Sequence, residues 1–174
     1  MSRFDDCLHL ILNFEGGFSN DPADPGGATN LGIIQKEYDA YRTGHGLPKQ
    51  SVKLITQAEA KDIYQKQYWD PLHAEFLAQP LDVVLFDTAV NLGVGRALHY
   101  LQNELGVANA STFDKNTSDA YHAYTAKHGV APLATAVLTQ RVAWYHHIGD
   151  SGKLNKFLKG WLNRVDALKK WAGM

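Results

Sequence analysis

The segment that most constrains the fold is residues 83–92, which read VVLFDTAVNL. Apolar side chains surround this segment on nearly every side of a helix, a pattern typical of a central helix covered by other helices. Pro80 and Asp82 precede the segment, and Gly93 marks its end. Helical patterns recur along the chain, so the sequence predicts a mainly α-helical globule. The expected helices are residues 4–15, 34–41, 57–68, 71–77, 83–92, 94–105, 117–127, 132–147 and 154–171.

Two capping boxes mark the starts of expected helices. Ser2 is followed three residues later by Asp5, and Thr56 is followed three residues later by Glu59. In such a pair the hydroxyl and the carboxylate accept hydrogen bonds from backbone N–H groups that the first turn of a helix leaves unpaired. We therefore expect one helix to begin after Ser2 and another after Thr56.

The composition excludes several classes of protein. The 174 residues suffice for one domain with a good core, and a formal net charge of −1 gives no broad field that attracts nucleic acid. Cys7 is the only cysteine, so an intramolecular disulfide is excluded, and we expect its side chain in the core. No apolar run approaches the ~20 residues that span a bilayer, so no stable membrane insertion is expected. The N-terminal residues also lack the pattern of a secretory signal.

The first expected helix ends on a carboxylic acid in an apolar row. Phe4, Leu8 and Ile11 share one helix face, and Glu15 takes the next place in that row. A buried carboxylate is costly unless it is paired. Partial burial and the negative end of the helix dipole both favour the protonated acid, which is the form that a proton donor to a glycosidic bond needs. Glu15 is therefore the first candidate for a general acid.

The loop after this helix supplies the other candidates. Residues 18–20 and 28–32 are expected to be short extended segments that form at most a small β element. Hydrolysis with inversion needs a second group that holds a water molecule, and Asp24 is the candidate, with Asp21 as its substitute. The alternative role of Asp24 is that of a turn residue before proline. Thr29 either orients the same water molecule through its hydroxyl or satisfies a backbone group in the loop.

Three segments together resemble a known family. Residues 15–33 read EGGFSNDPADPGGATNLGI and resemble the signature of glycoside hydrolase family 108, the lysozyme-like N-acetylmuramidases that include secretion activator proteins and phage endolysins. Residues 87–93 (DTAVNLG) and 157–165 (FLKGWLNRV) are similar to further blocks of that family. The resemblance implies a mainly α, lysozyme-like α+β fold, with a helical globule and a small β element after the first helix. It also implies a peptidoglycan hydrolase that cleaves the β-1,4 bond between N-acetylmuramic acid and N-acetylglucosamine, with Glu15 as general acid.

The resemblance also implies further site residues and a division of the chain. Asp24 and Thr29 best fit the Asp and the Thr of the more distant phage lysozymes, although the Thr stands one residue early. Residues 1–92 would be the catalytic lysozyme-like part. Residues 93–174 would be a C-terminal helical part that resembles the family's peptidoglycan-binding region and packs into the same globule.

The expected partners follow from this function. They are the glycan strands of peptidoglycan, with a holin or an export system for release of a protein that is made in the cytoplasm and acts in the periplasm or cell wall. No cofactor is expected. No metal site is expected either, because Asp21 and Asp24 lack the alternating acids of a calcium loop and the histidines lack zinc-ligand spacing.

Aromatic residues in the first half offer possible sugar contacts. Tyr64, Tyr68 and Trp69 are candidates for stacking on sugar rings, and their alternative role is in the core, as is usual for aromatics at helical spacing. Asp87 and Asn91 share a face of the central helix and are interpreted as structural.

The last block has a similar structural interpretation. Trp161 is expected to be a packing residue and Arg164 to form a surface ion pair.

Other functions are open on the sequence alone. A lytic transglycosylase needs one acid and no group that holds water, so it also fits Glu15. A wall-binding or export-adaptor protein with a lysozyme-like fold is the non-catalytic alternative. A chitinase-like activity is a further one, because the bond is chemically similar.

Overall fold

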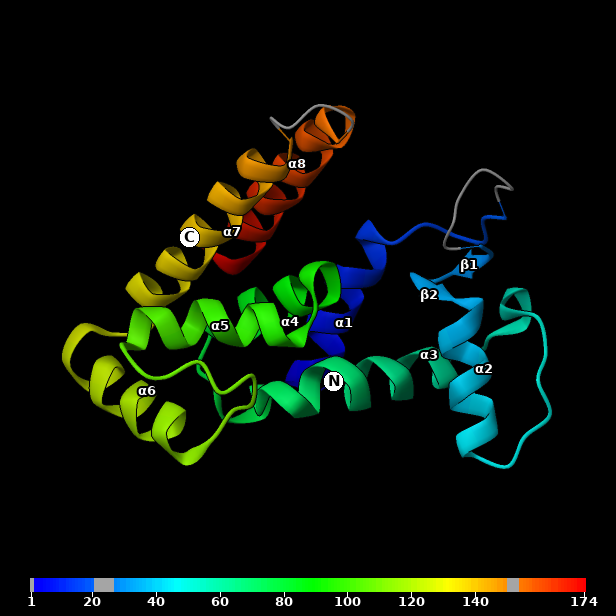
Figure 1. Cartoon of the computed structure of the whole chain (residues 1–174), viewed down its shortest axis with the longest axis horizontal. Helices are drawn as coiled ribbons and strands as arrows, with labels where there is room; N and C mark the ends of the chain where they lie inside the picture. The colour runs from blue at the N-terminus through cyan, green and yellow to red at the C-terminus, as the bar shows by residue number, and fades with distance from the viewer. Residues whose placement is uncertain (1, 21–26, 150–153) are drawn as a thin grey trace. The chain divides into compact units, whose positions relative to one another are not determined.

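The computed structural model describes residues 2–20, 27–149 and 154–174 of the chain (Figure 1). The chain divides into two compact units, Met1–Gln67 and Tyr68–Met174. The first unit contains α1 (Arg3–Phe14), β1 (Thr29–Asn30), β2 (Ile33–Ile34), α2 (Gln35–Gly44), the 3₁₀ turn η1 (Val52–Leu54) and α3 (Gln57–Tyr64). The second unit contains the 3₁₀ turns η3 (Asp70–Leu72) and η4 (Ala74–Phe76), and the helices α4 (Leu81–Leu92), α5 (Val94–Leu105), α6 (Lys115–His128), α7 (Ala131–Gly149) and α8 (Asn155–Ala172). The π-helical turn η2 (Gln65–Trp69) lies where the two units join in the sequence.

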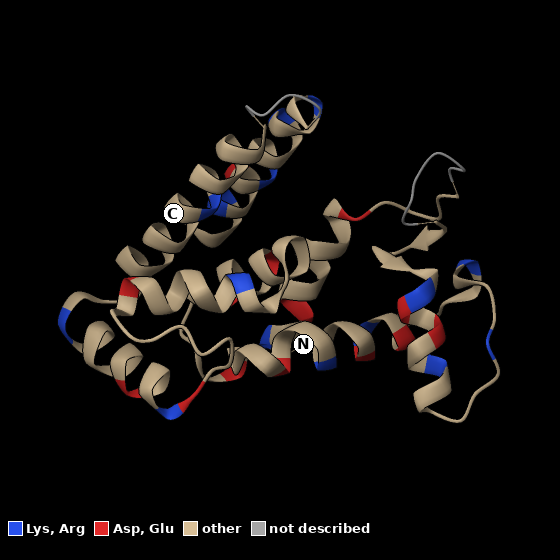
Figure 2. Ribbon diagram, viewed as in Figure 1, with Lys and Arg blue, Asp and Glu red and all other residues tan. Residues whose placement is uncertain are grey.

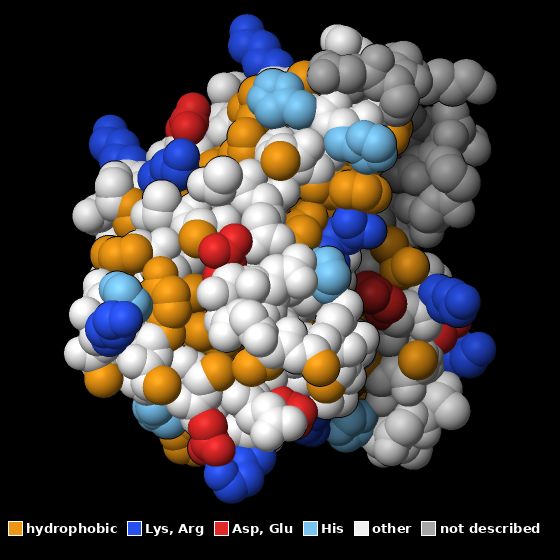
Figure 3. Space-filling view, turned by 60° about the vertical axis from the view of Figure 1, so that its left-hand side comes forward, with side chains coloured by type: hydrophobic (Ala, Val, Ile, Leu, Met, Phe, Trp, Pro, Cys, Tyr) orange, Lys and Arg blue, Asp and Glu red, His pale blue; other side chains and the backbone are white. Residues whose placement is uncertain are grey.

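This content confirms the expected fold class, a mainly α protein with a small antiparallel β element after the first helix. The division into a catalytic part, residues 1–92, and a wall-binding-like part, residues 93–174, concerns function and stays a prediction. Basic and acidic side chains are interspersed along the helices in Figure 2, and they are also interspersed on the face shown in Figure 3. Among the described residues, no helix is long and apolar enough to cross a membrane.

Helix α1 has the start and the end that the sequence predicts. Ser2 is its N-cap, and the Ser2 and Asp5 side chains form the expected capping box. Phe4, Leu8 and Ile11 are buried, as the apolar row predicts, and Cys7 is also buried. The helix ends at Phe14, and Glu15 is its C-cap residue.

The small sheet is a tight hairpin. Thr29 pairs with Ile34 and Asn30 pairs with Ile33 in an antiparallel register. Leu31 (φ 52°) and Gly32 (φ 75°) connect the strands, and positive φ at both central residues is the requirement of a type I′ turn. The expected extended segment 28–32 was therefore too long, because the turn interrupts it.

Helices α2 and α3 are joined by a buried polar cluster. Arg42 Nη1 lies 2.8 Å from Glu59 Oε1, and the Tyr38 hydroxyl donates to Glu59 Oε2 at 2.9 Å. Glu59 also completes the expected capping box with Thr56 at the start of α3. Burial alone would raise the pKa of Glu59, but hydrogen bonds from Thr56 and Tyr38 outweigh it and hold the pKa below its usual value.

The chain after α3 departs from the predicted helices. The expected helix 57–68 changes at Gln65 into the π-helical turn η2. The expected helix 71–77 is instead the pair of 3₁₀ turns η3 and η4, separated by His73 in the left-handed conformation (φ 49°). A helix cannot continue through such a residue, so the segment breaks at His73.

The second unit is built around α4, as the apolar segment predicts. Nine consecutive residues of this helix, from Leu81 to Ala89, are buried. Helix α4 packs against α5 and α7, and the two longest helices, α7 and α8, lie side by side (Figure 1). Gly93, Gly106 and Gly129 are the C-caps of α4, α5 and α6. The helix ends expected at residues 92 and 105 are confirmed, and α6 ends one residue later than expected.

A buried ion network connects α4, α7 and α8. Asp87 Oδ2 lies 2.6 Å from Arg141 Nη1, and both side chains are fully buried. Asp87 Oδ1 accepts from Arg164 Nε at 2.9 Å and lies 2.8 Å from Arg164 Nη2. Arg141 Nε donates to the Tyr145 hydroxyl at 2.8 Å. The structural interpretation of Asp87 is therefore confirmed.

The expectation for Arg164 was wrong. Its side chain is only 13% exposed and its partner Asp87 is fully buried, so this ion pair belongs to the interior. The sequence did not show this because the two residues are 77 positions apart. Trp161 has the expected packing role, with its ring stacked on Tyr145 at 5.1 Å between centroids.

Candidate active site

Glu15 stands where the chain leaves α1. Its backbone N–H donates to the Ile11 carbonyl at 3.1 Å, which is the last bond of the helix, while its own backbone is extended (φ −81°, ψ 134°). The residue is half-buried. The backbone of Glu15 is therefore held at the C-terminal end of α1, and the residue as a whole remains partly exposed to solvent.

Gly32 leaves the space that this carboxyl group occupies. A Cβ atom added at Gly32 would lie 2.8 Å from both Cγ and Oε2 of Glu15 and 2.5 Å from the hydroxyl oxygen of Tyr64. Real Cβ atoms essentially never approach heavy atoms this closely. The positive φ of Gly32 (75°) also favours glycine. Only a residue without a side chain allows Glu15 and Tyr64 to approach the turn in this way.

Tyr64, at the end of α3, holds the hairpin turn between β1 and β2. Its hydroxyl donates to the Leu31 carbonyl at 2.9 Å, and its side chain is 1% exposed. Tyr64 is the last residue of α3, so the start of the π-helical turn coincides with this contact. The structure thus brings together Glu15, Gly32 and Tyr64, from the end of α1, the hairpin turn and the end of α3.

Thr29 lies in strand β1 of the same hairpin. Its backbone exchanges two hydrogen bonds of 2.9 Å with Ser19, which closes the loop that follows Glu15. Because side chains alternate along a strand, Thr29 lies on the sheet face opposite to Asn30 and to the buried Ile33. Asp24 and its substitute Asp21 lie outside the described residues.

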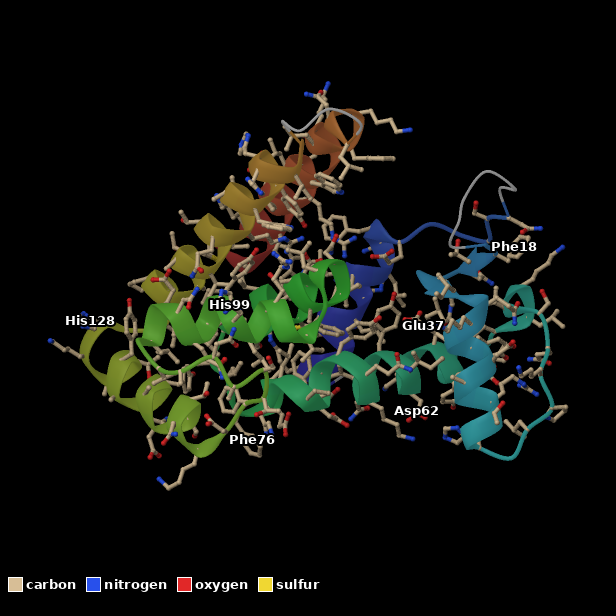
Figure 4. All side chains as sticks on the ribbon, in the orientation of Figure 1. Phe18, Glu37, Asp62, Phe76, His99 and His128 are labelled. Atoms are coloured by element: carbon tan, nitrogen blue, oxygen red, sulfur yellow. The ribbon has the colours of Figure 1, made fainter. Side chains whose placement is uncertain are left out.

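Phe18 is a candidate contact that the sequence reasoning missed. Its ring is 42% exposed, although it follows Glu15 by only three residues, and Lys53 Nζ lies 5.5 Å from the ring centroid (Figure 4 labels Phe18). Three residues span at most about 11 Å, so Phe18 lies near the end of α1. Asn30 Nδ2 donates to the carbonyls of Val52 and Lys53 and so ties Lys53 to the hairpin. An apolar residue inside a Gly- and Pro-rich loop was the signal available in the sequence.

The three aromatic candidates have different environments. Trp69 is 3% exposed and packs edge-on against Phe86, with 5.3 Å between ring centroids. Tyr64 is also buried, so Tyr64 and Trp69 occupy core positions, the alternative that the sequence left open. Tyr68 is half-buried in the π-helical turn. Their contact with sugar stays a prediction.

The described residues contain no group of three or more His, Cys, Asp or Glu side chains that could hold a metal ion. Around Glu15, the described residues present its own carboxyl group, the hydroxyl group of Tyr64 and the backbone of the hairpin turn. This set suits proton transfer to a leaving oxygen.

Comparisons with known proteins agree with this chemistry. A model of the family described as glycosyl hydrolase 108 matches residues 8–93. The solved structure of SagA from Brucella abortus is similar to the chain, with a TM-score of 0.77 and 31% sequence identity. That similarity covers 97% of this chain and 92% of the SagA chain. The chain belongs to the glycosyl hydrolase 108 family. A comparison with curated proteins gave no match.

Membership in the glycosyl hydrolase 108 family confirms the resemblance seen in the sequence, and the SagA similarity confirms the mainly α, lysozyme-like fold. The matched region begins in α1, includes the hairpin and α3, and ends at Gly93 directly after α4. At the level of the family, the chain is therefore a glycoside hydrolase that acts on a glycan.

Proposed function

We propose that the chain is an N-acetylmuramidase, which cleaves the β-1,4 bond between N-acetylmuramic acid and N-acetylglucosamine in peptidoglycan, with Glu15 as the general acid. The observation that carries the proposal is the placement of the Glu15 carboxyl group against Gly32 and Tyr64. The hydroxyl group of Tyr64 donates to the Leu31 carbonyl, so the tyrosine holds the hairpin turn in place beside this carboxyl group.

In the proposed reaction, Glu15 protonates the oxygen of the departing sugar while the bond at the anomeric carbon breaks. Asp24, with the help of the Thr29 hydroxyl, positions the water molecule that attacks this carbon. The bridge between Ser19 and Thr29 supports this assignment, because it holds both ends of the loop that contains Asp24 at one strand. The family match supports the general acid at the level of glycoside hydrolysis.

One surface of the first unit supports binding of a glycan strand. The exposed ring of Phe18 offers an apolar face for a sugar ring, and Lys53 beside it offers a charge for a carboxylate of the wall. Among the three sugar-stacking candidates, Tyr68 retains the exposure that such a contact needs.

Action on peptidoglycan requires passage out of the cytoplasm, so a holin or an export system belongs to this proposal as the expected partner. The C-terminal residues 93–174 belong to it as a wall-binding-like part.

Digestion of purified sacculi by the wild type and by Glu15→Gln tests the proposal. We expect the variant to keep its circular dichroism spectrum and to release soluble muropeptides at least about 100-fold more slowly, because general acid catalysis contributes that much or more. The matched control is Glu75→Gln, which removes one exposed carboxylate elsewhere and should keep full activity.

The products identified by mass spectrometry separate the competing functions. Reducing N-acetylmuramic acid ends support the muramidase, whereas 1,6-anhydro ends identify a lytic transglycosylase. Binding of sacculi without any turnover by the wild type identifies a non-catalytic wall-binding protein. Full activity of Glu15→Gln would show that Glu15 is not the general acid.

A further inference from the structure

A groove of about 420 Å³ lies between α5 and α7 in the second unit. Its lining combines a guanidinium group, an indole ring, a phenol and an imidazole, contributed by Arg96, Trp144, Tyr100 and His147. Figure 4 labels His99, another lining residue, on the side of α5 that faces α7. Neither the family match, which ends at Gly93, nor the proposed catalytic residues account for this groove.

The surroundings of Arg96 differ from those of Arg42, Arg141 and Arg164. Arg42 pairs with Glu59, and both Arg141 and Arg164 pair with the same aspartate. Within the described parts of the chain, no carboxylate pairs with Arg96. Its guanidinium carbon instead lies 3.7 Å from the centroid of the Trp144 ring.

The contact with Trp144 restrains the guanidinium group of Arg96 and leaves its positive charge without a carboxylate partner among the described residues. Both Arg96 and Trp144 are half-buried, so the ring holds the guanidinium plane in one orientation. A guanidinium group donates two parallel hydrogen bonds to a carboxylate or a phosphate group. Arg96 is therefore preorganised for such an anion.

Tyr100 provides an independent observation in the same groove. Its side chain is 6% exposed, and its hydroxyl group is buried with no hydrogen-bond partner among the described residues. A buried hydroxyl group without a partner is costly, and native proteins usually pair such groups. Because Tyr100 lines the groove, a ligand oxygen that displaces the atoms covering this hydroxyl group would be an acceptor for it.

The wall around these groups is held in place by hydrogen bonds. Gln140 Nε2 donates to the Tyr100 carbonyl at 2.9 Å and to Glu104 Oε1 at 2.6 Å. The two ring nitrogens of His99 lie beside the side-chain amides of Asn103 and Asn109, at 3.1 and 2.5 Å. These contacts occupy the amides and His99, and they leave Arg96, Tyr100 and His147 as the polar side chains of the lining that take no part in them.

We propose that the groove between α5 and α7 is an anion-binding site for a carboxylate or phosphate group, with Arg96 as the bidentate donor and the Tyr100 hydroxyl as a further donor. The proposal does not depend on the muramidase activity or on Glu15. Its failure and the failure of the proposed function are therefore separate results.

Titration of the full chain with inorganic phosphate and with acetate, at constant ionic strength, tests the site. The readout is the NMR signal of the Trp144 indole N–H and of the Arg96 guanidinium N–H. We expect saturable shifts in the wild type and an affinity at least about tenfold lower in Arg96→Met, because charge-assisted hydrogen bonds are lost. Arg96→Lys should bind with intermediate affinity, because it keeps the charge and loses the fork.

The control is Lys127→Met, which removes an exposed cation of α6 and should bind as the wild type does. Preference for phosphate over acetate points to a phosphate-bearing ligand, and the reverse preference points to a carboxylate-bearing one. Absence of a saturable shift with either anion, or wild-type affinity in Arg96→Met, overturns the proposal.

Tyr100→Phe gives a second measurement that does not depend on the stability of the Arg96 variants. Removal of the unpaired hydroxyl group should leave the thermal midpoint of the free protein unchanged or raise it, while anion affinity falls by several-fold. A fall in the thermal midpoint without a change in affinity means that the hydroxyl has a structural role, and it removes Tyr100 from the site.

Discussion

Position 32 decides how closely the hairpin turn approaches Glu15. The carboxyl group of Glu15 and the hydroxyl of Tyr64 both lie within 3 Å of the point where a side chain at Gly32 would begin. Tyr64 is not the flexible tip of a surface chain, since it is buried and its hydroxyl group donates to the Leu31 carbonyl. A methyl group at this position therefore has to displace the proposed acid, the tyrosine or the turn itself.

We predict that Gly32→Ala lowers wall-lytic activity by about 100-fold, as a displacement of about 1 Å at a catalytic group does. The free energy of unfolding should also fall by about 1–2 kcal/mol, because φ of 75° is unfavourable for alanine. Muropeptide release and urea denaturation provide the two measurements.

Gly160→Ala is the matched control for this substitution. Gly160 lies in α8 with nothing within 4 Å of an added Cβ, so alanine there should stabilise the helix by up to about 1 kcal/mol and leave activity unchanged. A Gly32→Ala variant with wild-type rate and stability would show that the close approach of Gly32 to Glu15 and Tyr64 is not needed.

At the scale of the element, the start of α1 depends on an acid that two neighbours hold ionised. The hydrogen bond from Lys61, whose Nζ lies 2.5 Å from Asp5 Oδ1, and those from Ser2 lower the pKa of Asp5 to about 2. Because the folded pKa lies below the unfolded value of 3.8, the contribution of Asp5 to stability is present above about pH 4. It is lost as the pH falls toward 2.

We predict that the thermal midpoint of the wild type falls more steeply between pH 5 and pH 2 than that of Asp5→Asn. The amide cannot ionise, so the variant lacks this part of the pH dependence and is less stable than the wild type at pH 5. Asp6→Asn, which changes the adjacent exposed acid, should keep the wild-type slope. Equal slopes for wild type and Asp5→Asn would show that the contacts with Lys61 and Ser2 do not hold Asp5 ionised in solution.

The elements differ in how well local sequence predicts them. The start of α1 and the ends at Gly93 and Gly106 are encoded by neighbouring residues, so the sequence predicted them. The break at His73 was missed, because no glycine or asparagine marks the left-handed conformation in the sequence. The π-helical turn after Tyr64 was missed for a similar reason.

The candidate site shows the same contrast. Glu15 was predicted because its position follows from the period of one helix. The contacts around Glu15 were not predicted, because the hydrogen bond from Tyr64 to Leu31 spans 33 positions of the chain. Phe18 was missed because exposure of an apolar residue is not readable from the residue itself.

At the scale of the whole molecule, α4 has two roles. It is the last helix of the region that matches the family, and it is the central helix of the second unit. The match ends directly after this helix, and α4 carries Asp87, which faces guanidinium groups from α7 and α8. One carboxylate thus holds two cations in an interior where unpaired charge is expensive. This makes Asp87 the residue on which the joining of these three helices most depends.

We predict that Asp87→Asn lowers the free energy of unfolding by about 3–5 kcal/mol, because the fully buried guanidinium group of Arg141 then loses the carboxylate that neutralises it. Arg164→Met should cost less, since the Arg164 side chain is 13% exposed and its loss leaves Asp87 paired with Arg141. Urea denaturation followed by circular dichroism measures both, with Asp166→Asn on the exposed side of α8 as the control.

The triple variant Asp87→Leu, Arg141→Met, Arg164→Met removes all three partners together. It should recover most of the lost free energy of unfolding, because none of the three charges remains. If the triple variant is less stable than Asp87→Asn, the helices are held by the specific geometry of the ion pairs and not by the need to neutralise buried charge.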